Sequence, residues 1–125
     1  MYKIIRKAEA VIRQVSDNKT ATNFVTKEIS PNVSLAIIEN KGHFGKVTAE
    51  NNRIYYMLKG NLSLEFSSER IELNEGDACF ISCGTPYDMS GDCKVVTVDS
   101  PAFQDKSIVA DEKLWAGESA KRKNI

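Results

Sequence analysis

Two short stretches of sequence decide the fold of this chain: RIYYMLKG, at residues 53–60, and GDACFISCGTPY, at residues 76–87. Each joins an apolar run of strand length to glycine. Glycine adopts the positive φ angles of tight turns that a residue with a Cβ atom resists. Gly60 and Gly76, sixteen positions apart, therefore predict two strands that end in sharp turns and fold back across one another.

The rest of the chain repeats this pattern of short apolar runs separated by turn residues. We predict strands at residues 2–5, 23–29, 33–38, 53–58, 62–66, 70–73, 78–81 and 94–98. Clusters of Gly, Pro, Asn, Asp and Ser stand between them, and these residues favour turns. Many short strands at regular spacing indicate an all-β sandwich or barrel.

Two segments depart from the strand pattern. Lys7–Val15 carries apolar residues at helical spacing, which predicts a short N-terminal helix packed on the end of the barrel. Residues 110–125 are charged with few apolar anchors, which is typical of a solvated C-terminal tail. We find no repeat and no linker, so we expect a single domain over residues 1–125.

Composition excludes several classes of function. The chain has 125 residues and 17 basic against 17 acidic side chains, so its net charge of +0 offers no positive field for nucleic acid. No apolar run approaches the ~20 residues that span a bilayer. The N-terminal sequence MYKIIRKAEAVIRQ lacks the apolar core of a secretory signal, so we expect a cytoplasmic protein.

The two opening stretches resemble the two conserved motifs of the cupin superfamily. The first is similar to the end of the first motif, and the second has the Gly-Asp turn, strand and proline turn of the second motif. The resemblance covers about residues 33–103. It implies a double-stranded antiparallel β-helix, that is, a jelly-roll barrel with a cavity open at one end, and a homodimer.

Most cupins hold a divalent metal through two histidines and a glutamate of the first motif and a histidine of the second. All four ligand positions have changed here. The two early histidine positions fall at Val47 and Ala49, or at Lys46 and Thr48 if the gap is one residue longer. The glutamate position falls at Arg53, and the last histidine position falls at Tyr87. The chain has one histidine, and a guanidinium repels a cation. We therefore expect no metal and no cofactor.

In the family the acidic ligand points inward, so alternation predicts Arg53 and Tyr55 inside the barrel. A buried guanidinium needs an anion, because arginine does not shed its proton. The anion is either internal, such as Glu65 or Glu50, or a ligand carboxylate or phosphate; a register error would instead turn Arg53 outward. Tyr87 either contacts the ligand or fills volume at the mouth of the barrel.

Three functions remain open. The first is a metal-free barrel that binds a small anionic or sugar-like metabolite through Arg53, Tyr55, Tyr87 and Glu65. The second is a metal-independent sugar isomerase or epimerase, in which His43 or a carboxylate such as Glu65 acts with a tyrosine. The third is a non-catalytic dimeric barrel that assembles through an outer face carrying Ile54, Tyr56 and Leu58. The alternative for this face is that the N-terminal helix covers it.

Overall fold

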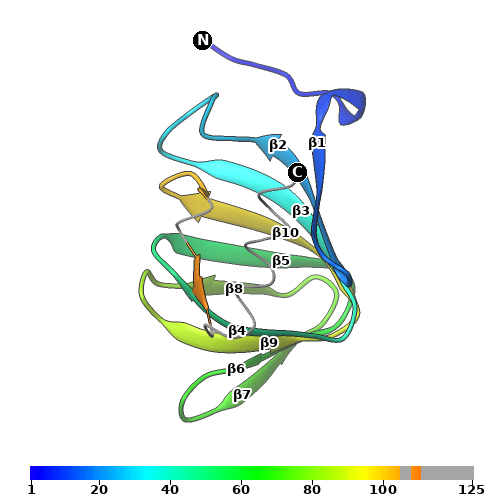
Figure 1. Cartoon of the computed structure of the whole chain (residues 1–125), viewed down its shortest axis with the longest axis vertical. Coiled ribbons are helices and arrows are strands. Elements are labelled where there is room, and N and C mark those ends of the chain that lie inside the picture. Colours follow the sequence, from blue (N-terminus) through cyan, green and yellow to red (C-terminus); the bar gives the residue numbers. More distant parts are fainter. Residues whose placement is uncertain (105–107, 111–125) are drawn as a thin grey trace.

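The computed structural model describes residues 1–104 and 108–110, which form two antiparallel sheets (Figure 1). The six-stranded sheet has the order β1 (Val11–Ser16), β2 (Lys19–Val25), β3 (Ser34–Asn40), β10 (Cys93–Ser100), β5 (Asn52–Gly60) and β8 (Ala78–Ile81). The five-stranded sheet has the order β11 (Ile108–Ala110), β4 (His43–Ala49), β9 (Pro86–Ser90), β6 (Leu62–Glu65) and β7 (Arg70–Leu73). This is the all-β barrel that the motifs predicted.

Strand β5 shows why the two faces of the six-stranded sheet differ. Buried and exposed residues alternate along it, with Arg53, Tyr55 and Met57 inside and Ile54 and Tyr56 outside. Successive side chains of a strand point to opposite faces, so the register of the strand decides which of its residues all face inward. The inward direction predicted for Arg53 is therefore confirmed, and the outward alternative is excluded.

The predicted glycine turns are present. Gly60 ends β5 with a φ of +77°, and a Cβ built there would overlap the carbonyl oxygen of Asp92. Gly76 has a φ of +87° in the turn before β8. These turns let β5 pair with β8 on one side and β10 on the other, so that the two motif strands lie side by side.

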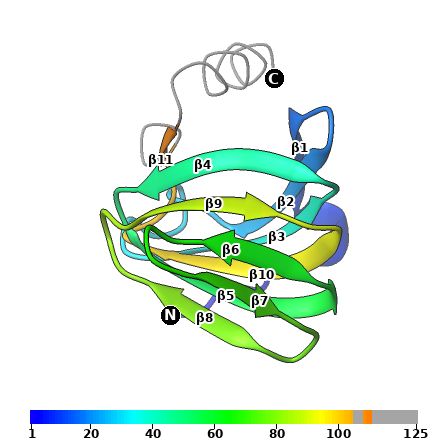
Figure 2. The ribbon, with the colours of Figure 1, turned by 90° about the horizontal axis from the view of Figure 1, so that it is seen from below.

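The two sheets face one another, as the view from below shows (Figure 2), and enclose the core. Fully buried side chains come from both sheets, among them Met57 and Val95 from one and Leu62, Leu64 and Met89 from the other. Burying such side chains contributes roughly 1.5–3 kcal/mol each. Apolar packing between the two sheets therefore stabilises the core.

The predicted N-terminal helix is wrong. Only Lys7–Glu9 forms a single 3₁₀ turn, and Val11–Ser16 is strand β1, paired with β2 from Val11 opposite Asn23 to Ser16 opposite Lys19. Pairing with β2 satisfies the backbone over this segment, and this tertiary context overrides the helical spacing of its apolar residues. The strand predicted at residues 2–5 is also absent, and Tyr2 is 86% exposed.

Three further strands, β4, β9 and β11, were not predicted. Strands β4 and β9 have no continuous apolar run, because Gly45 and Lys46 interrupt β4 and Asp88 interrupts β9. They form one wall of the barrel because each pairs with the other. The predicted tail lies, from residue 111 onward, outside the described residues. Within the described part of the chain, no helix is long and apolar enough to cross a membrane.

Candidate functional site: a polar cavity between the sheets

The interior holds a cavity of about 60 Å³ between the two sheets, here called the central cavity. Its described lining is Arg13, Val15, Lys19, Ala21, Asn23, Ser34, Ala36, Ile38, Phe44, Val47, Arg53, Tyr55, Met89, Thr97, Asp99 and Phe103. The space arises where small inward side chains, Ala21 and Ala36, stand on neighbouring strands β2 and β3.

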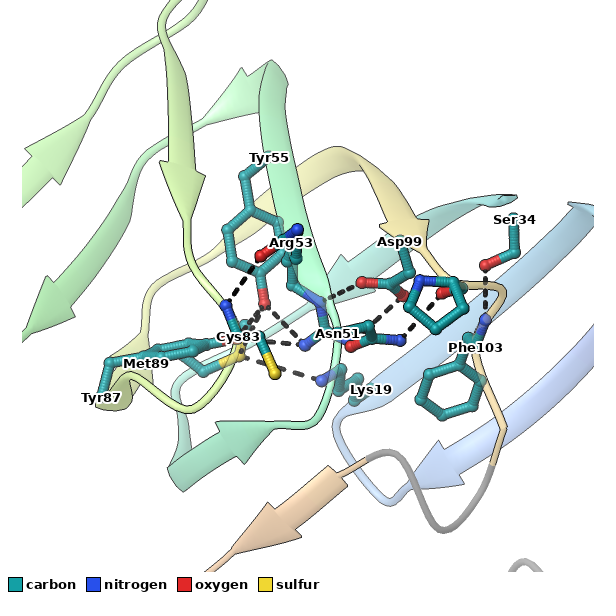
Figure 3. A network of polar contacts seen from close by, with 12 residues as sticks. Lys19, Ser34, Asn51, Arg53, Tyr55, Cys83, Tyr87, Met89, Asp99 and Phe103 are labelled. Atoms are coloured by element: carbon teal, nitrogen blue, oxygen red, sulfur yellow. Dashed lines mark hydrogen bonds and ion pairs between the residues drawn. The ribbon is translucent and has the colours of Figure 1, made fainter. Parts of the chain in front are cut away.

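Arg53 is held by a carboxylate that the sequence analysis did not name. Its Nε atom donates to Oδ1 of Asp99 at 2.7 Å, and its Nη2 atom donates to Oδ2 at 3.2 Å (Figure 3). The residues lie opposite each other on β5 and β10, and they are 5% and 4% exposed. This two-point geometry is the strong form of a charge-assisted pair. Burial opposes the charged form, but Tyr87, Tyr55 and Asp99 outweigh it and raise the pKa of Arg53.

The remaining guanidinium nitrogen, Nη1, donates hydrogen bonds to two phenols. Nη1 of Arg53 donates to the hydroxyl of Tyr87 at 3.0 Å and to that of Tyr55 at 3.4 Å, and the two hydroxyls are 2.8 Å apart. The rings meet edge to face at 83°. Burial, and then the neighbouring Tyr87, raise the pKa of Tyr55 well above its ordinary value of 10.0. The Tyr55 phenol therefore acts as a neutral hydrogen-bonding group at neutral pH.

Lys19 brings a second cationic group to the cavity wall. The residue is 9% exposed, and its Nζ atom lies 3.6 Å from the centre of the Phe44 ring. Nζ is also 3.8 Å from the sulfur of Met89, which the Tyr55 hydroxyl approaches at the same distance of 3.8 Å. Lys19 and Tyr55 thus converge on one thioether (Figure 3), and a thioether is a weak acceptor.

Thr97 supplies a buried hydroxyl that lacks a partner. It is 6% exposed, it lines the cavity, and its Oγ1 atom has no hydrogen-bond partner among the described residues. Thr97 lies directly between Ala36 of β3 and Tyr55 of β5 in the sheet. A buried polar group left unsatisfied costs about 1–3 kcal/mol. A hydrogen-bonding atom in the cavity would satisfy this hydroxyl.

The residues at the former ligand positions do not fit a divalent metal. Val47 and Ala49 are each 2% exposed and point inward, so the first of the two alignments gives the inward pair. They have no ligating atoms, and the guanidinium of Arg53 occupies the third position together with Asp99. Among the described residues, no cluster of three or more His, Cys, Asp or Glu side chains is arranged to hold a metal.

The structure does not bring Glu65, Glu50 or His43 to Arg53. Glu65 and Glu50 are exposed, so Asp99, and neither of these carboxylates, is the internal anion. His43 is also outside the cavity, with 57% of its side chain exposed, and its Nε2 atom lies 2.7 Å from Oδ1 of Asp88. The pairing of His43 with Tyr55 or Tyr87 in one cavity is therefore wrong.

Sequence reasoning missed Asp99, Lys19 and Thr97. A signal existed for two of them, because Thr97 and Asp99 continue the inward alternation that begins at Val95 in a predicted strand. Nothing in the sequence could show that this strand lies beside β5, because more than 30 residues of chain separate the two paired strands. Lys19 lies on a strand that was predicted to begin only at residue 23.

A second pocket, of about 360 Å³, borders the five-stranded sheet. It is lined by Lys46, Glu65, Phe66, Ser67, Pro86, Tyr87 and Asp88. Tyr87 belongs to both regions, because its hydroxyl reaches Arg53 while its ring lies 6.0 Å from that of Phe66. The structure thus places Glu65 and Tyr87 around one pocket, separate from Arg53 and Tyr55 in the central cavity.

Comparison with known sequences identifies no relative: no protein-family model and no curated protein matches this chain. Comparison with solved structures finds proteins of similar fold. Pac13 of Streptomyces, described as a unique nucleoside dehydratase, is 14% identical over 89% of this chain and 92% of its own, with a TM-score of 0.76. Variants of Pac13 have been solved with uridine.

Two other structures are similar over most of their length. KdgF from Halomonas sp. is 18% identical over 85% of this chain and 99% of its own, with a TM-score of 0.73. The polyketide cyclase RemF from Streptomyces resistomycificus is 18% identical over 80% of each chain, with a TM-score of 0.66. All three are cupin-fold proteins. The chain therefore has the cupin fold that its two motifs predicted.

Proposed function

We propose that this protein binds a small polar metabolite, anionic or sugar-like, in the central cavity and without a metal ion. The observation that carries the proposal is the unpartnered Oγ1 of Thr97 in a cavity whose wall also bears Lys19 and the Tyr55 hydroxyl. Sites for small molecules are concave and mostly apolar, with a few converging polar groups. The central cavity has this composition, with Ile38, Phe44 and other apolar residues around the polar ones.

The structures of similar fold support a small organic molecule as the class of ligand. Uridine is bound in structures of Pac13, and RemF is described as a polyketide cyclase. Uridine and polyketides are both small organic molecules. In this chain the role first predicted for Arg53 changes: it positions the hydroxyls of Tyr55 and Tyr87 through Nη1 and is itself neutralised by Asp99.

Thermal unfolding with a panel of neutral sugars, sugar acids, sugar phosphates and nucleosides tests the proposal. A ligand that binds only the folded state and is present at 100 times its Kd adds about 2.7 kcal/mol of stability, so a bound metabolite raises the Tm by several degrees. Thr97→Val should reduce this rise, and Thr48→Val, which changes a residue lining neither pocket, should not. No rise with any compound at millimolar concentration would overturn the proposal.

The second pocket supports a second candidate, a metal-independent isomerase or epimerase that uses a carboxylate with a tyrosine. Glu65 and Tyr87 both line that pocket. In such a reaction the Glu65 carboxylate would take the proton from the carbon beside a carbonyl and return one to the neighbouring carbon, which restores the carboxylate. The Tyr87 ring would line the pocket while its hydroxyl stays bonded to Arg53. Incorporation of deuterium from heavy water into a bound sugar, followed by NMR, tests this, and its absence with every bound sugar would exclude it.

We also propose that the chain forms a homodimer through the outer face of the six-stranded sheet. Two adjacent rows of side chains cross this face and define an apolar belt. The first row is Phe80, Ile54, Val98 and Leu35, and the second is Ala78, Tyr56, Val96, Ile37, Thr22 and Ile12. The only polar groups in this set are the hydroxyls of Thr22 and Tyr56. The N-terminal segment forms no helix that could cover the belt.

The size and surroundings of the belt favour a second copy of the chain as its partner. Six strands span about 24 Å from first to last. Ile12, Ile54, Tyr56 and Phe80 are each between 42% and 69% exposed. The next row toward the ends of the strands, which includes Glu39, Lys59 and Lys94, is charged. An apolar centre with a polar rim is the arrangement of interfaces that bury about 800 Å² per partner.

A further inference from the structure

Inward side chains of three neighbouring strands form an ordered wall of the central cavity, here called the inner ladder. Each rung takes one residue from β3, one from β10 and one from β5. The first rung is Ser34, Asp99 and Arg53, and the second is Ala36, Thr97 and Tyr55. The next rung, which starts at Ile38 on β3, is apolar throughout. The ladder therefore changes from polar to apolar along the cavity, and Thr97 lies at the change.

The charges of the inner ladder are already matched. Nε and Nη2 of Arg53 donate to the two oxygens of Asp99, and Nη1 donates to the two phenols (Figure 3). An external anion in place of Asp99 would leave a buried carboxylate without its cation, which is strongly unfavourable. Arg13 and Lys19, the other cations of the described lining, also have partners of their own. The ladder therefore suits an uncharged ligand.

One phenolic hydrogen of the site lacks a strong acceptor within the described part of the chain. Tyr55 and Tyr87 each carry one hydroxyl hydrogen, and the 2.8 Å hydrogen bond between their oxygens uses one of the two. Nη1 of Arg53 donates to both oxygens, so it takes up neither hydrogen. The other hydrogen is left with the sulfur of Met89, 3.8 Å from the Tyr55 oxygen (Figure 3). Because a thioether is a weak acceptor, a ligand oxygen in the cavity would accept this hydrogen more strongly.

Thr97 and Asp99 supply the groups that complement this donor. The Thr97 hydroxyl is 6% exposed and has no hydrogen-bond partner among the described residues. Asp99 lies two positions further along the same face of β10, and each of its oxygens accepts one hydrogen bond from Arg53. A carboxylate oxygen has lone pairs for a second hydrogen bond. A ligand hydroxyl beside these residues can therefore accept from Thr97 and donate to Asp99.

The size of the central cavity limits the ligand that these groups can bind. A volume of about 60 Å³ holds roughly four to six water-sized groups. A molecule of two or three carbons with two oxygens fills this room, and two oxygens in so small a molecule stand on neighbouring carbons. The apolar end of the cavity, at Ala36 and Ile38, suits the remaining carbon.

We propose that the inner ladder binds a compact uncharged 1,2-diol or hydroxyketone. One ligand hydroxyl lies between Thr97 and Asp99, the neighbouring oxygen accepts the hydrogen of Tyr55, and the carbon end contacts Ala36 and Ile38. This assignment rests on the proposed binding function and narrows its ligand to a small member of the sugar-like class.

NMR titration with three probes of equal size tests the assignment: propane-1,2-diol, and the alcohols 2-methylpropan-1-ol and butan-2-ol, which each replace one oxygen of the diol by carbon. The diol should bind with a millimolar Kd and about 2- to 10-fold more tightly than either alcohol, because each alcohol leaves one polar group of the wall unsatisfied. Thr97→Val removes a hydroxyl at nearly constant shape and should weaken the diol by a similar factor. For the alcohol that lacks the oxygen held by Thr97, the same variant should change the Kd little.

Two further variants and one further probe separate recognition from folding and from charge. Thr97→Ser keeps the hydroxyl and should retain the preference for the diol, even if Thr97→Val unfolds the protein. Thr48→Val, at a residue that lines neither pocket, should change no affinity. Lactate carries a carboxylate in place of the primary hydroxyl of the diol, and it should bind more weakly. Tighter binding of lactate would overturn the assignment of an uncharged ligand.

The outcomes distinguish this assignment from the proposed binding function. If a compound of the thermal-unfolding panel binds, but the diol binds no better than the alcohols or is unaffected by Thr97→Val, the assignment is wrong and the binding function stands. If neither the panel nor the three probes bind at millimolar concentration, the binding function fails and the assignment fails with it.

Discussion

Asp99 and Arg53 face each other across adjacent strands β10 and β5, and two hydrogen bonds of 2.7 and 3.2 Å join their side chains inside the barrel. Arg53 stands where the cupin resemblance placed a metal-ligating glutamate. The guanidinium is thus a fixed cation with its own counter-ion, and Nη1 holds Tyr55 and Tyr87 beside it. The polar centre of this barrel is built from one ion pair and two phenols.

Removing the charge of Asp99 should destabilise the fold strongly. Asp99→Asn leaves a buried guanidinium without its anion, so we expect the free energy of unfolding to fall by about 3–5 kcal/mol. Urea denaturation measures it. Asp92→Asn, at an exposed aspartate, should change it by less than about 0.5 kcal/mol. The double variant Arg53→Met with Asp99→Leu should recover most of the loss, and an Asp99→Asn protein as stable as the original would contradict this account.

The protein should retain no divalent metal. Val47 and Ala49 provide no ligating atom, and Arg53 repels a cation. After incubation with zinc, nickel, manganese or iron and removal of free ions, mass spectrometry should find less than about a tenth of an equivalent per chain. A stoichiometric ion would show that a different set of residues forms a metal site.

Alkaline pH should destabilise the protein through Tyr55. Its pKa is raised in the folded state above 10.0, so the folded protein keeps a proton that the unfolded chain loses. This contribution is fully present below pH 10.0 and is lost as the pH rises toward the folded pKa. Urea denaturation between about pH 8 and 11.5 should therefore give a shallower decline for Tyr55→Phe than for the unaltered protein. Equal declines would contradict the assignment.

Gly60 and Gly76 should differ in their tolerance of a side chain. Both have positive φ, but a Cβ at Gly76 meets no atom within 4 Å, whereas one at Gly60 overlaps the Asp92 carbonyl oxygen. Gly76→Ala should cost about 1–2 kcal/mol from backbone strain alone. Gly60→Ala should cost clearly more, because the backbone of the turn must also shift. Equal losses in chemical denaturation would show that the turn relaxes freely.

A charge in the apolar belt should dissociate the proposed dimer. Ile54 belongs to the belt and is 42% exposed, and Ile54→Arg would bury a guanidinium without a partner in the interface. Light scattering after gel filtration should change from dimer mass to monomer mass. Val33→Arg, at a loop residue outside the belt that is 40% exposed, is the matched control. An unaltered protein that is monomeric at high concentration refutes the interface but leaves the cavity proposals intact.

The sequence by itself determined the barrel and which side chains of strand β5 point into it. The glycine turns at Gly60 and Gly76 and the alternation along residues 53–58 are local properties, so they could be recognised without knowledge of the partners. The same local reasoning failed for residues 7–15, where the spacing of apolar residues suits a helix. Pairing of β1 with β2 decides that segment instead, and pairing is a property of the whole fold.

Only the tertiary structure decided which groups meet Arg53. Alternation sends Arg53 inward, but the choice of Asp99 over Glu65 or Glu50 depends on β10 lying beside β5 in one register. The same placement brings Lys19, from β2, and Thr97 to the cavity and leaves His43 outside it. A strand's own sequence fixes which side chains share a face, whereas its neighbours in the sheet are fixed by contacts between residues far apart in the chain.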